Sequence, residues 1–135
     1  MAILIPNASE VTLLQAALGF STPGNQLLKL FVNNVVPGDA DVAATYTEMS
    51  TLGYAAKTLT KGSWSVASTA NVGTASYAQQ TWTFSAGTAV TVYGYFVVDA
   101  TSGLLLWAES FTTPKVAQFA GDQILITPQI TLSKV

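Results

Sequence analysis

The 135-residue sequence contains no cysteine, no histidine and no arginine. Without cysteine the chain can form no disulfide, no thiolate metal site and no cysteine nucleophile. Without histidine it lacks the most common general base and metal ligand, and every Ser-His-Asp arrangement is excluded. An enzyme built from this sequence would depend on seven carboxylates, five lysines and the tyrosine hydroxyls. We therefore expect no catalytic residue, no cofactor and no metal site, and predict that the protein is not an enzyme.

Charge is also scarce. Only 9% of the residues are charged, against roughly 25% in an ordinary globular protein. The net charge is −2, and the five basic residues are scattered lysines: Lys29, Lys57, Lys61, Lys115 and Lys134. Nucleic-acid binding needs a basic face and usually uses arginine for bidentate contacts. We expect no nucleic-acid partner, and a surface that is covered by uncharged polar groups or hidden against other proteins.

The apolar runs are too short for a membrane. The run Val90–Val98 is far below the roughly 20 apolar residues that span a bilayer, and Asp99 ends it. The N-terminal MAILIPNASE has no positively charged region, and Pro6 interrupts its apolar run after five residues. We expect no membrane partner and no secretion signal.

One short helix is expected near the N terminus. Ser9 can cap its first amides, Glu10 complements the helix dipole, and Gly19 can close its end. Four apolar residues lie on or beside one face of this helix: Val11, Leu13, Leu14 and Leu18. A helix of about ten residues is marginal alone, so we expect this face to dock on the chain's own sheet or on a neighbouring subunit.

The rest of the chain predicts one β domain. Strand-like runs recur at roughly 8–12-residue spacing, which is typical of a sandwich or jelly roll. These runs are Gln26–Asn33, Tyr54–Leu59, Trp64–Ser68, Tyr77–Ser85, Ala89–Asp99, Leu104–Phe111, Lys115–Phe119 and Gln123–Leu132. The segment TANVGTA is expected to be a loop. We predict an all-β, sandwich or jelly-roll-like domain over residues 25–135, preceded by an N-terminal segment with the short helix over residues 1–24.

Three local patterns make more detailed predictions. In the first run, Leu28, Leu30 and Val32 alternate with polar and aromatic residues and should share one face. Pro128 cannot donate to a strand ladder, so it predicts an edge or a bulge in a strand whose Ile124, Ile126, Ile130 and Leu132 share one face. Gly94, between two tyrosines, predicts a bulge or a close backbone approach.

The segment TVYGYFVVDATSGLLLWAESF, residues 91–111, predicts two apolar strands around a turn at residues 99–103. Strict alternation places Val92, Phe96 and Val98 on one face and Tyr93, Tyr95 and Val97 on the other. In the second strand it places Leu105, Trp107 and Phe111 together, opposite Leu104 and Leu106. Because both faces are apolar, we expect one to fill the core and the other to be covered by a neighbouring subunit. The candidate interface residues are therefore Leu13, Leu14, Leu18, Tyr93, Tyr95 and Trp107.

Polar and aromatic residues offer weak alternatives. Asp39 and Asp41 have the spacing of calcium ligands but lack the remaining ligands of a calcium loop, so a turn cap is favoured. Four further carboxylates, at predicted turns or in strands, could supply a glycosidase pair or be ordinary solvated groups: Glu48, Asp99, Glu109 and Asp122. Eight rings could form a sugar-stacking platform or belong to the core and interfaces: Trp64, Trp82, Trp107, Tyr46, Tyr54, Tyr77, Tyr93 and Tyr95.

The order of segments resembles that of small structural proteins of tailed bacteriophages. The similarity is carried by NQLLKLFVNNVVPGDADVAATYTEMSTLGYAAKTL, SYAQQTWTF, VYGYFVVDATSGLLLWAESF and GDQILITPQITL, which cover most of the chain from Asn25 onward. The resemblance implies a capsid decoration or cement protein, a β-sandwich or jelly-roll domain that assembles as a homotrimer on the outer shell. Some proteins of this kind are assigned to tails or fibres. No catalytic residue is transferred.

The expected function is therefore that of a non-enzymatic virion protein. It would bind and stabilise the shell of major capsid protein as a homotrimer on the capsid surface, after synthesis in the host cytoplasm. Residues 1–20, with their leucines, are the candidate contact to a neighbouring subunit or to the shell. The alternative is a receptor- or glycan-binding module of a phage tail or head fibre, which would stack its tryptophans and tyrosines on host glycans.

Overall fold

The computed structural model describes residues 5–19, 24–69 and 72–133, and the structural findings below refer to these ranges. They contain one α-helix, α1 (Asn7–Ala17), and nine strands. The strands are β1 (Gln26–Phe31), β2 (Lys57–Leu59), β3 (Ser65–Thr69), β4 (Val72–Ser76), β5 (Gln80–Thr83), β6 (Val90–Asp99), β7 (Leu105–Ala117), β8 (Gln123–Ile126) and β9 (Gln129–Ser133). The predicted all-β class with a short N-terminal helix is confirmed, whereas the finer jelly-roll topology stays a prediction.

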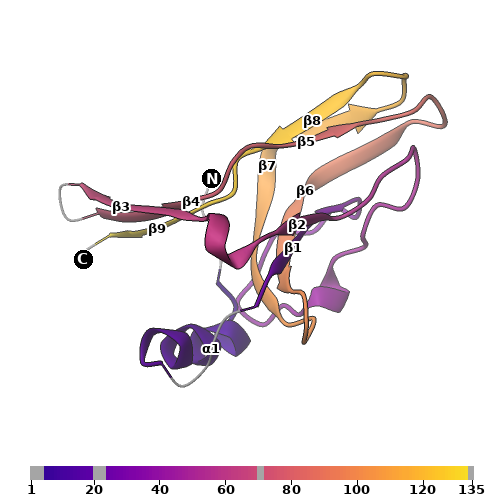
Figure 1. Cartoon of the computed structure of the whole chain (residues 1–135). Coiled ribbons are helices and arrows are strands. Elements are labelled where there is room, and N and C mark those ends of the chain that lie inside the picture. Colours follow the sequence, from indigo (N-terminus) through magenta and orange to yellow (C-terminus); the bar gives the residue numbers. More distant parts are fainter. Residues whose placement is uncertain (1–4, 20–23, 70–71, 134–135) are drawn as a thin grey trace.

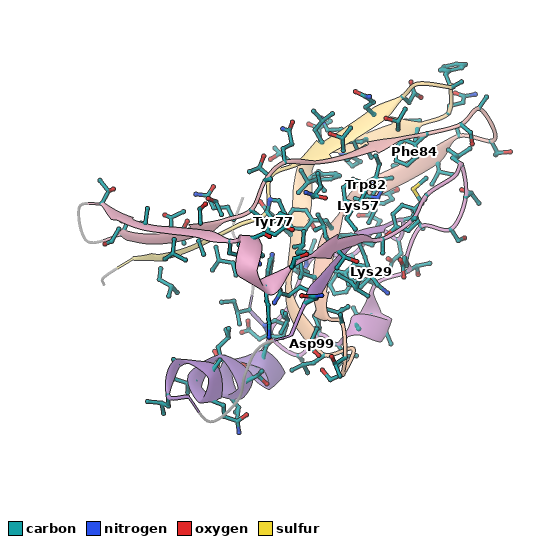
Figure 2. All side chains as sticks on the ribbon, in the orientation of Figure 1. Lys29, Lys57, Tyr77, Trp82, Phe84 and Asp99 are labelled. Carbon is teal, nitrogen blue, oxygen red and sulfur yellow. The ribbon has the colours of Figure 1, made fainter. Side chains whose placement is uncertain are left out.

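A four-stranded antiparallel sheet in the order β2-β1-β6-β7 forms the centre of the molecule (Figure 1). We call it the central sheet. Its first face carries Leu28, Leu30 and Val97, which are fully buried. The two-stranded pair β5–β8 supplies the opposing layer: Trp82, Phe84, Ile124 and Ile126 belong to the same core cluster. In Figure 2, Trp82 and Phe84 lie between this pair and the central sheet.

The second face of the central sheet is also buried. Phe31 and Phe96 project from it, and Tyr46 packs on both, with ring centroids 5.0 and 5.2 Å apart. Tyr46 comes from the connection between β1 and β2, which also brings Val35 and Ala43 onto this face. The expectation that a neighbouring subunit covers the second face is therefore corrected, because the chain covers it with its own residues 32–47.

Two bulges change which side chains share a face. The pairing of β6 with β7 shifts between Val92 and Gly94, and again between Val97 and Val98. We call the buried cluster on the first face of the central sheet the first core, and the cluster on its second face the second core. As a result of the shifts, Val92 packs with Tyr95 in the first core, whereas Tyr93 packs against the second core, which contains Phe96. In β7, Leu105 and Trp107 lie in different cores. The predicted alternation is confirmed for Tyr95 and Val97 opposite Phe96 and Val98. It was wrong for Val92, Tyr93 and Leu105, because the irregular pairing interrupts the alternation of side chains next to them.

The two irregularities signalled by single residues are confirmed. A Cβ on Gly94 would lie 2.2 Å from the Glu109 carbonyl oxygen and 2.6 Å from the Phe31 ring, and the register shift is at this point. Pro128 separates β8 from β9, where the three residues 77–79 oppose the two residues 127–128. This bulge joins two halves of one long antiparallel pair, formed by β4 and β5 on one side and β8 and β9 on the other.

The outer half of that pair leaves the body of the molecule. There β4 pairs with β9 on one side and with β3 on the other, and we call the three strands the projecting sheet. Figure 1 shows it extending away from the central sheet, on the same side as α1, and in Figure 2 Tyr77 lies at its base. The prediction of a loop at TANVGTA, residues 69–75, was wrong for its described residues, because Thr69 ends β3 and residues 72–75 belong to β4, whereas residues 70–71 lie outside the described ranges. The predicted break between Phe111 and Lys115 is also absent, since β7 continues through Pro114, which an edge strand tolerates.

A candidate assembly surface

The helix α1 is attached to the body through Ser9. Its hydroxyl is fully buried and donates to the Leu105 carbonyl oxygen at 2.8 Å, at the start of β7. The residue at the N-cap is Pro6, and no side chain caps the helix. The prediction that Ser9 caps α1 is therefore corrected: its side chain anchors the helix to the sheet. Gly19, with φ of 77°, closes the other end as predicted.

Several apolar side chains of α1 and of its C-cap residue, Leu18, are exposed to solvent. Val11, Leu14 and Leu18 are 58%, 62% and 70% exposed, and Leu13 is 42% exposed. Burial on the chain's own sheet was one of the two expectations for this face, and these side chains do not show it. We call Val11, Leu14 and Leu18 the outer face of α1. A face this apolar and this exposed is typical of a surface that contacts another protein.

The projecting sheet carries a second apolar surface, in which Val66 and Leu132 are exposed while Ala75 and Ile130 are half-buried. Because strand residues alternate, Val66, Ala75 and Ile130 lie side by side across β3, β4 and β9 on one face, and Leu132 is next in line on β9. Val66 is 79% and Leu132 is 69% exposed. We call these four residues the apolar face of the projecting sheet. The alternation of Ile130 and Leu132 was recognised in the sequence. The middle strand, β4, was not predicted, because its alanine and glycine residues give no alternation of polarity.

A groove separates the projecting sheet from α1. Its volume is about 790 Å³, and its walls are mostly apolar. The side chains that line it include Leu13, Ala16, Trp64, Ala75, Leu106 and Ile130. Helix and sheet therefore form two apolar walls that do not close on each other.

The other candidate interface residues lie elsewhere. Tyr95 and Trp107 are each only 4% exposed and belong to the first core, and Tyr93 is half-buried. The Tyr95 hydroxyl donates to Glu109, and burial, followed by this bond, raises the pKa of Tyr95 well above its usual value. The tyrosine therefore stays protonated. Tyr95 and Trp107 are part of the core of this chain and are not displayed next to the three leucines of α1.

Each of the four carboxylates considered for catalysis accepts hydrogen bonds from other groups of the chain. Glu48 accepts from Lys29 Nζ at 2.8 Å and from the Tyr54 hydroxyl at 3.0 Å. Burial is the main cause of the raised pKa of Tyr54, which Glu48 increases further. Glu109 is bonded to Tyr95 on the adjacent strand. Both glutamates thus complete hydrogen bonds within the sheet.

The aspartates act at turns. Asp41 Oδ2 accepts from the Gly38 amide at 2.8 Å, as the predicted turn cap requires. Asp99 accepts from the amides of Ser102 and Thr101, and these bonds hold the pKa of its carboxyl below the usual value. Asp122 accepts from two amides of its own turn in the same way, with the same direction of pKa shift.

The aromatic rings are used inside the molecule. Each of the eight rings considered for a sugar platform is buried or half-buried. Trp64 Nε1 donates to Gln26 Oε1 at 3.0 Å, and Trp82 Nε1 donates to the Ala55 carbonyl oxygen at 2.8 Å. Trp64 also packs edge-on against Trp107 and Tyr77. These contacts stabilise the junction between the projecting sheet and the body.

Within the described ranges, no three carboxylates gather as a metal site would need. In the same part of the chain, no helix has the length and apolar character needed to cross a membrane. Neither a scan against protein-family models nor a search of curated proteins finds a match for this chain.

Proposed function

We propose that this chain is a non-enzymatic structural protein of a tailed-phage virion, a decoration protein that binds the shell of major capsid protein as a homotrimer. The phage context rests on the resemblance of the segments from Asn25 onward. The assembly role rests on one observation, the outward-facing apolar side chains of α1. The groove beside α1 adds a second apolar wall to the same side of the molecule.

The body of the protein has the properties that a passive binding role needs. The central sheet is covered on both faces by the chain's own residues, so the fold does not depend on a ligand. The half-buried glutamates and the turn aspartates are engaged in internal hydrogen bonds. A trimer would attach to the shell through three equivalent sites, and multivalency would convert modest single contacts into stable binding.

Two measurements test this proposal. Light scattering of the purified chain should give about 42 kDa, three times the 14.1 kDa of one copy. Antibodies against the chain should label the outer shell of tailed-phage particles in electron micrographs. Labelling confined to the tail would show that the chain is a tail or fibre protein and not a shell protein. Particles that contain no copy of the chain would overturn the virion assignment. The glycan-binding alternative has no favouring observation, because its rings are buried or half-buried.

A further inference from the structure

We propose that the outer face of α1 in one copy packs on the apolar face of the projecting sheet in the next copy. This inference rests on the proposed function and deepens it, because it assigns the surfaces through which the homotrimer forms. The two surfaces are Val11, Leu14 and Leu18 on the helix, and Val66, Ala75, Ile130 and Leu132 on the sheet.

The projecting sheet lacks a covering layer of its own. All five residues of β3 are exposed, and those of β4 are only half-buried. A small sheet is stable in water when its apolar face packs on a helix or on another layer. The outer edge of β3 also has no charged residue and no proline, the usual protection of a free edge. The sheet therefore has the properties of an element that is completed by another chain.

The helix of the same copy does not provide this layer. Ser9 fixes α1 on the start of β7, and the groove between α1 and the sheet stays open. Val11, Leu14 and Leu18 are mostly exposed to solvent. A second copy of the chain carries the same helix with the same free face, so it can supply the missing layer.

The dimensions of the two surfaces agree. Val11 and Leu18 are seven residues apart, which is about 10.5 Å along a helix. The row Val66–Ala75–Ile130 crosses three strands, which is about 9.6 Å at the usual strand spacing. One helix ridge can therefore cover the full width of the projecting sheet.

The exposed area and the charge favour a second copy as the occupant. The chain exposes 7682 Å², whereas a folded monomer of this mass should expose about 6,700 Å². The surplus of about 1,000 Å² is comparable to the roughly 800 Å² that one partner buries in one standard interface, and each copy of a trimer can divide it between its two contacts. The three strands of the projecting sheet contain no charged residue, and α1 contains only Glu10. Self-association therefore brings few like charges together.

The two surfaces are compatible with a homotrimer. Because the helix surface and the sheet surface are different, each copy can give its helix to one neighbour and its sheet to the other, which is a heterologous contact. A ring of three copies satisfies all helix and sheet surfaces and leaves none open for further growth.

The first experiment introduces charged substitutions into the full-length chain and measures the purified protein in the absence of capsid shells. Leu14→Glu and Val66→Glu should each shift the trimer to monomer in sedimentation, and should raise the dissociation constant by roughly 30-fold or more. Both side chains are largely exposed, so circular dichroism melts should show a folded monomer. One control should leave the trimer intact: Val116→Glu, which places the same charge at an exposed strand valine near the far end of β7.

The second experiment uses cysteine cross-linking, which is clean because the chain has no cysteine. A mixture of Leu14→Cys and Val66→Cys chains should form a disulfide between the two variants under mild oxidation, and neither variant should cross-link to itself efficiently. Self-cross-linking of Val66→Cys without the mixed product would indicate sheet-to-sheet pairing and overturn the inference.

The outcomes separate this inference from the proposed function. If the wild-type chain is a trimer and both glutamate variants remain trimers, the inference fails while shell labelling can still support the virion role. If the variants are monomers but no virion contains the chain, the interface stands and the phage role fails. A wild-type chain that is still monomeric at about 100 μM would overturn both the interface and the homotrimer.

Discussion

The two halves of one long strand pair behave very differently. Where β5 pairs with β8, the inward side chains Trp82, Ile124 and Ile126 are buried against the central sheet. Where β4 pairs with β9, the side chain of Leu132 continues the same alternation but is exposed. The pattern of residues is similar in both halves, so what differs is whether the chain has another layer to place opposite them.

The bulge at Pro128 marks the boundary between the two halves. Three residues oppose two there, which increases twist and bends the pair away from the central sheet. The Trp64, Tyr77 and Trp107 rings fill the junction. The body is thus complete in one chain, and the projecting sheet is the region where another molecule can contribute.

The largest expected effect on the body comes from Gly94→Ala. The new methyl group would collide with the Glu109 carbonyl oxygen and the Phe31 ring. We expect a loss of about 4 kcal/mol in the free energy of unfolding, measured by urea denaturation, because the backbone of β6 and β7 must separate. Gly62→Ala is the control, since no atom lies within 4 Å of the added group. Equal stabilities of the two variants would contradict the close approach.

Truncation of matched apolar residues compares the two regions directly. Leu30→Ala removes a fully buried side chain of the central sheet and should cost about 3 kcal/mol. Val66→Ala removes a largely exposed side chain of the projecting sheet and should change the stability of the monomer by less than about 0.5 kcal/mol. Urea titrations at concentrations where the chain is monomeric measure both. A large loss for Val66→Ala in the monomer would show that the projecting sheet has its own core.

Ser9→Ala tests how α1 is attached. The change removes the hydroxyl that donates to the Leu105 carbonyl oxygen and should cost about 1 kcal/mol. Hydrogen exchange of the α1 amides should accelerate, while exchange in β1 and β6 stays slow. Ser63→Ala on the surface is a suitable control, because its side chain is exposed. Unchanged exchange in α1 would mean that other contacts hold the helix.

The smallest expected effect concerns pH. The folded-state pKa of Asp99 lies below its unfolded value, so its contribution to stability is present above about pH 4 and is lost as pH falls through the folded-state pKa. Thermal unfolding followed from pH 6 to pH 2 should show a shallower decline for Asp99→Asn than for the wild type. The projecting strands β3, β4 and β9 contain no titratable side chain, so changes confined to them should leave this slope unaltered. An identical slope in Asp99→Asn would remove Asp99 as a source of acid sensitivity.

Several elements could be predicted because their signal is local. Leu28 and Leu30 of β1, and Val32 directly after it, pack in or against one core as the alternation predicted. Pro128 and Gly94 identified both irregular positions through properties of single residues, the missing amide of proline and the missing Cβ of glycine. The three leucines of α1 were also identified, since helical spacing alone places them on or beside one surface.

Other features could not be predicted from a local pattern. Val92, Tyr93 and Leu105 were assigned to the wrong faces. Both faces of β6 and β7 are apolar, so hydrophobicity does not show where an irregularity changes the face of the neighbouring side chains. β4 escaped notice because small residues give no alternation of polarity. The role of Ser9 was also inaccessible, since its acceptor lies 96 residues away in the chain.

By itself, the sequence determined the all-β class, the single short helix and the lack of histidine and cysteine chemistry, because these depend on composition and on short-range periodicity. Only the tertiary structure decided which apolar surfaces are satisfied within the chain and which are left open. The connection over residues 32–47 covers the second face of the central sheet, whereas no described segment covers the projecting sheet. The physical reason is that burial is a property of layers brought together from distant parts of the chain, and an apolar strand carries no record of which layer it will meet.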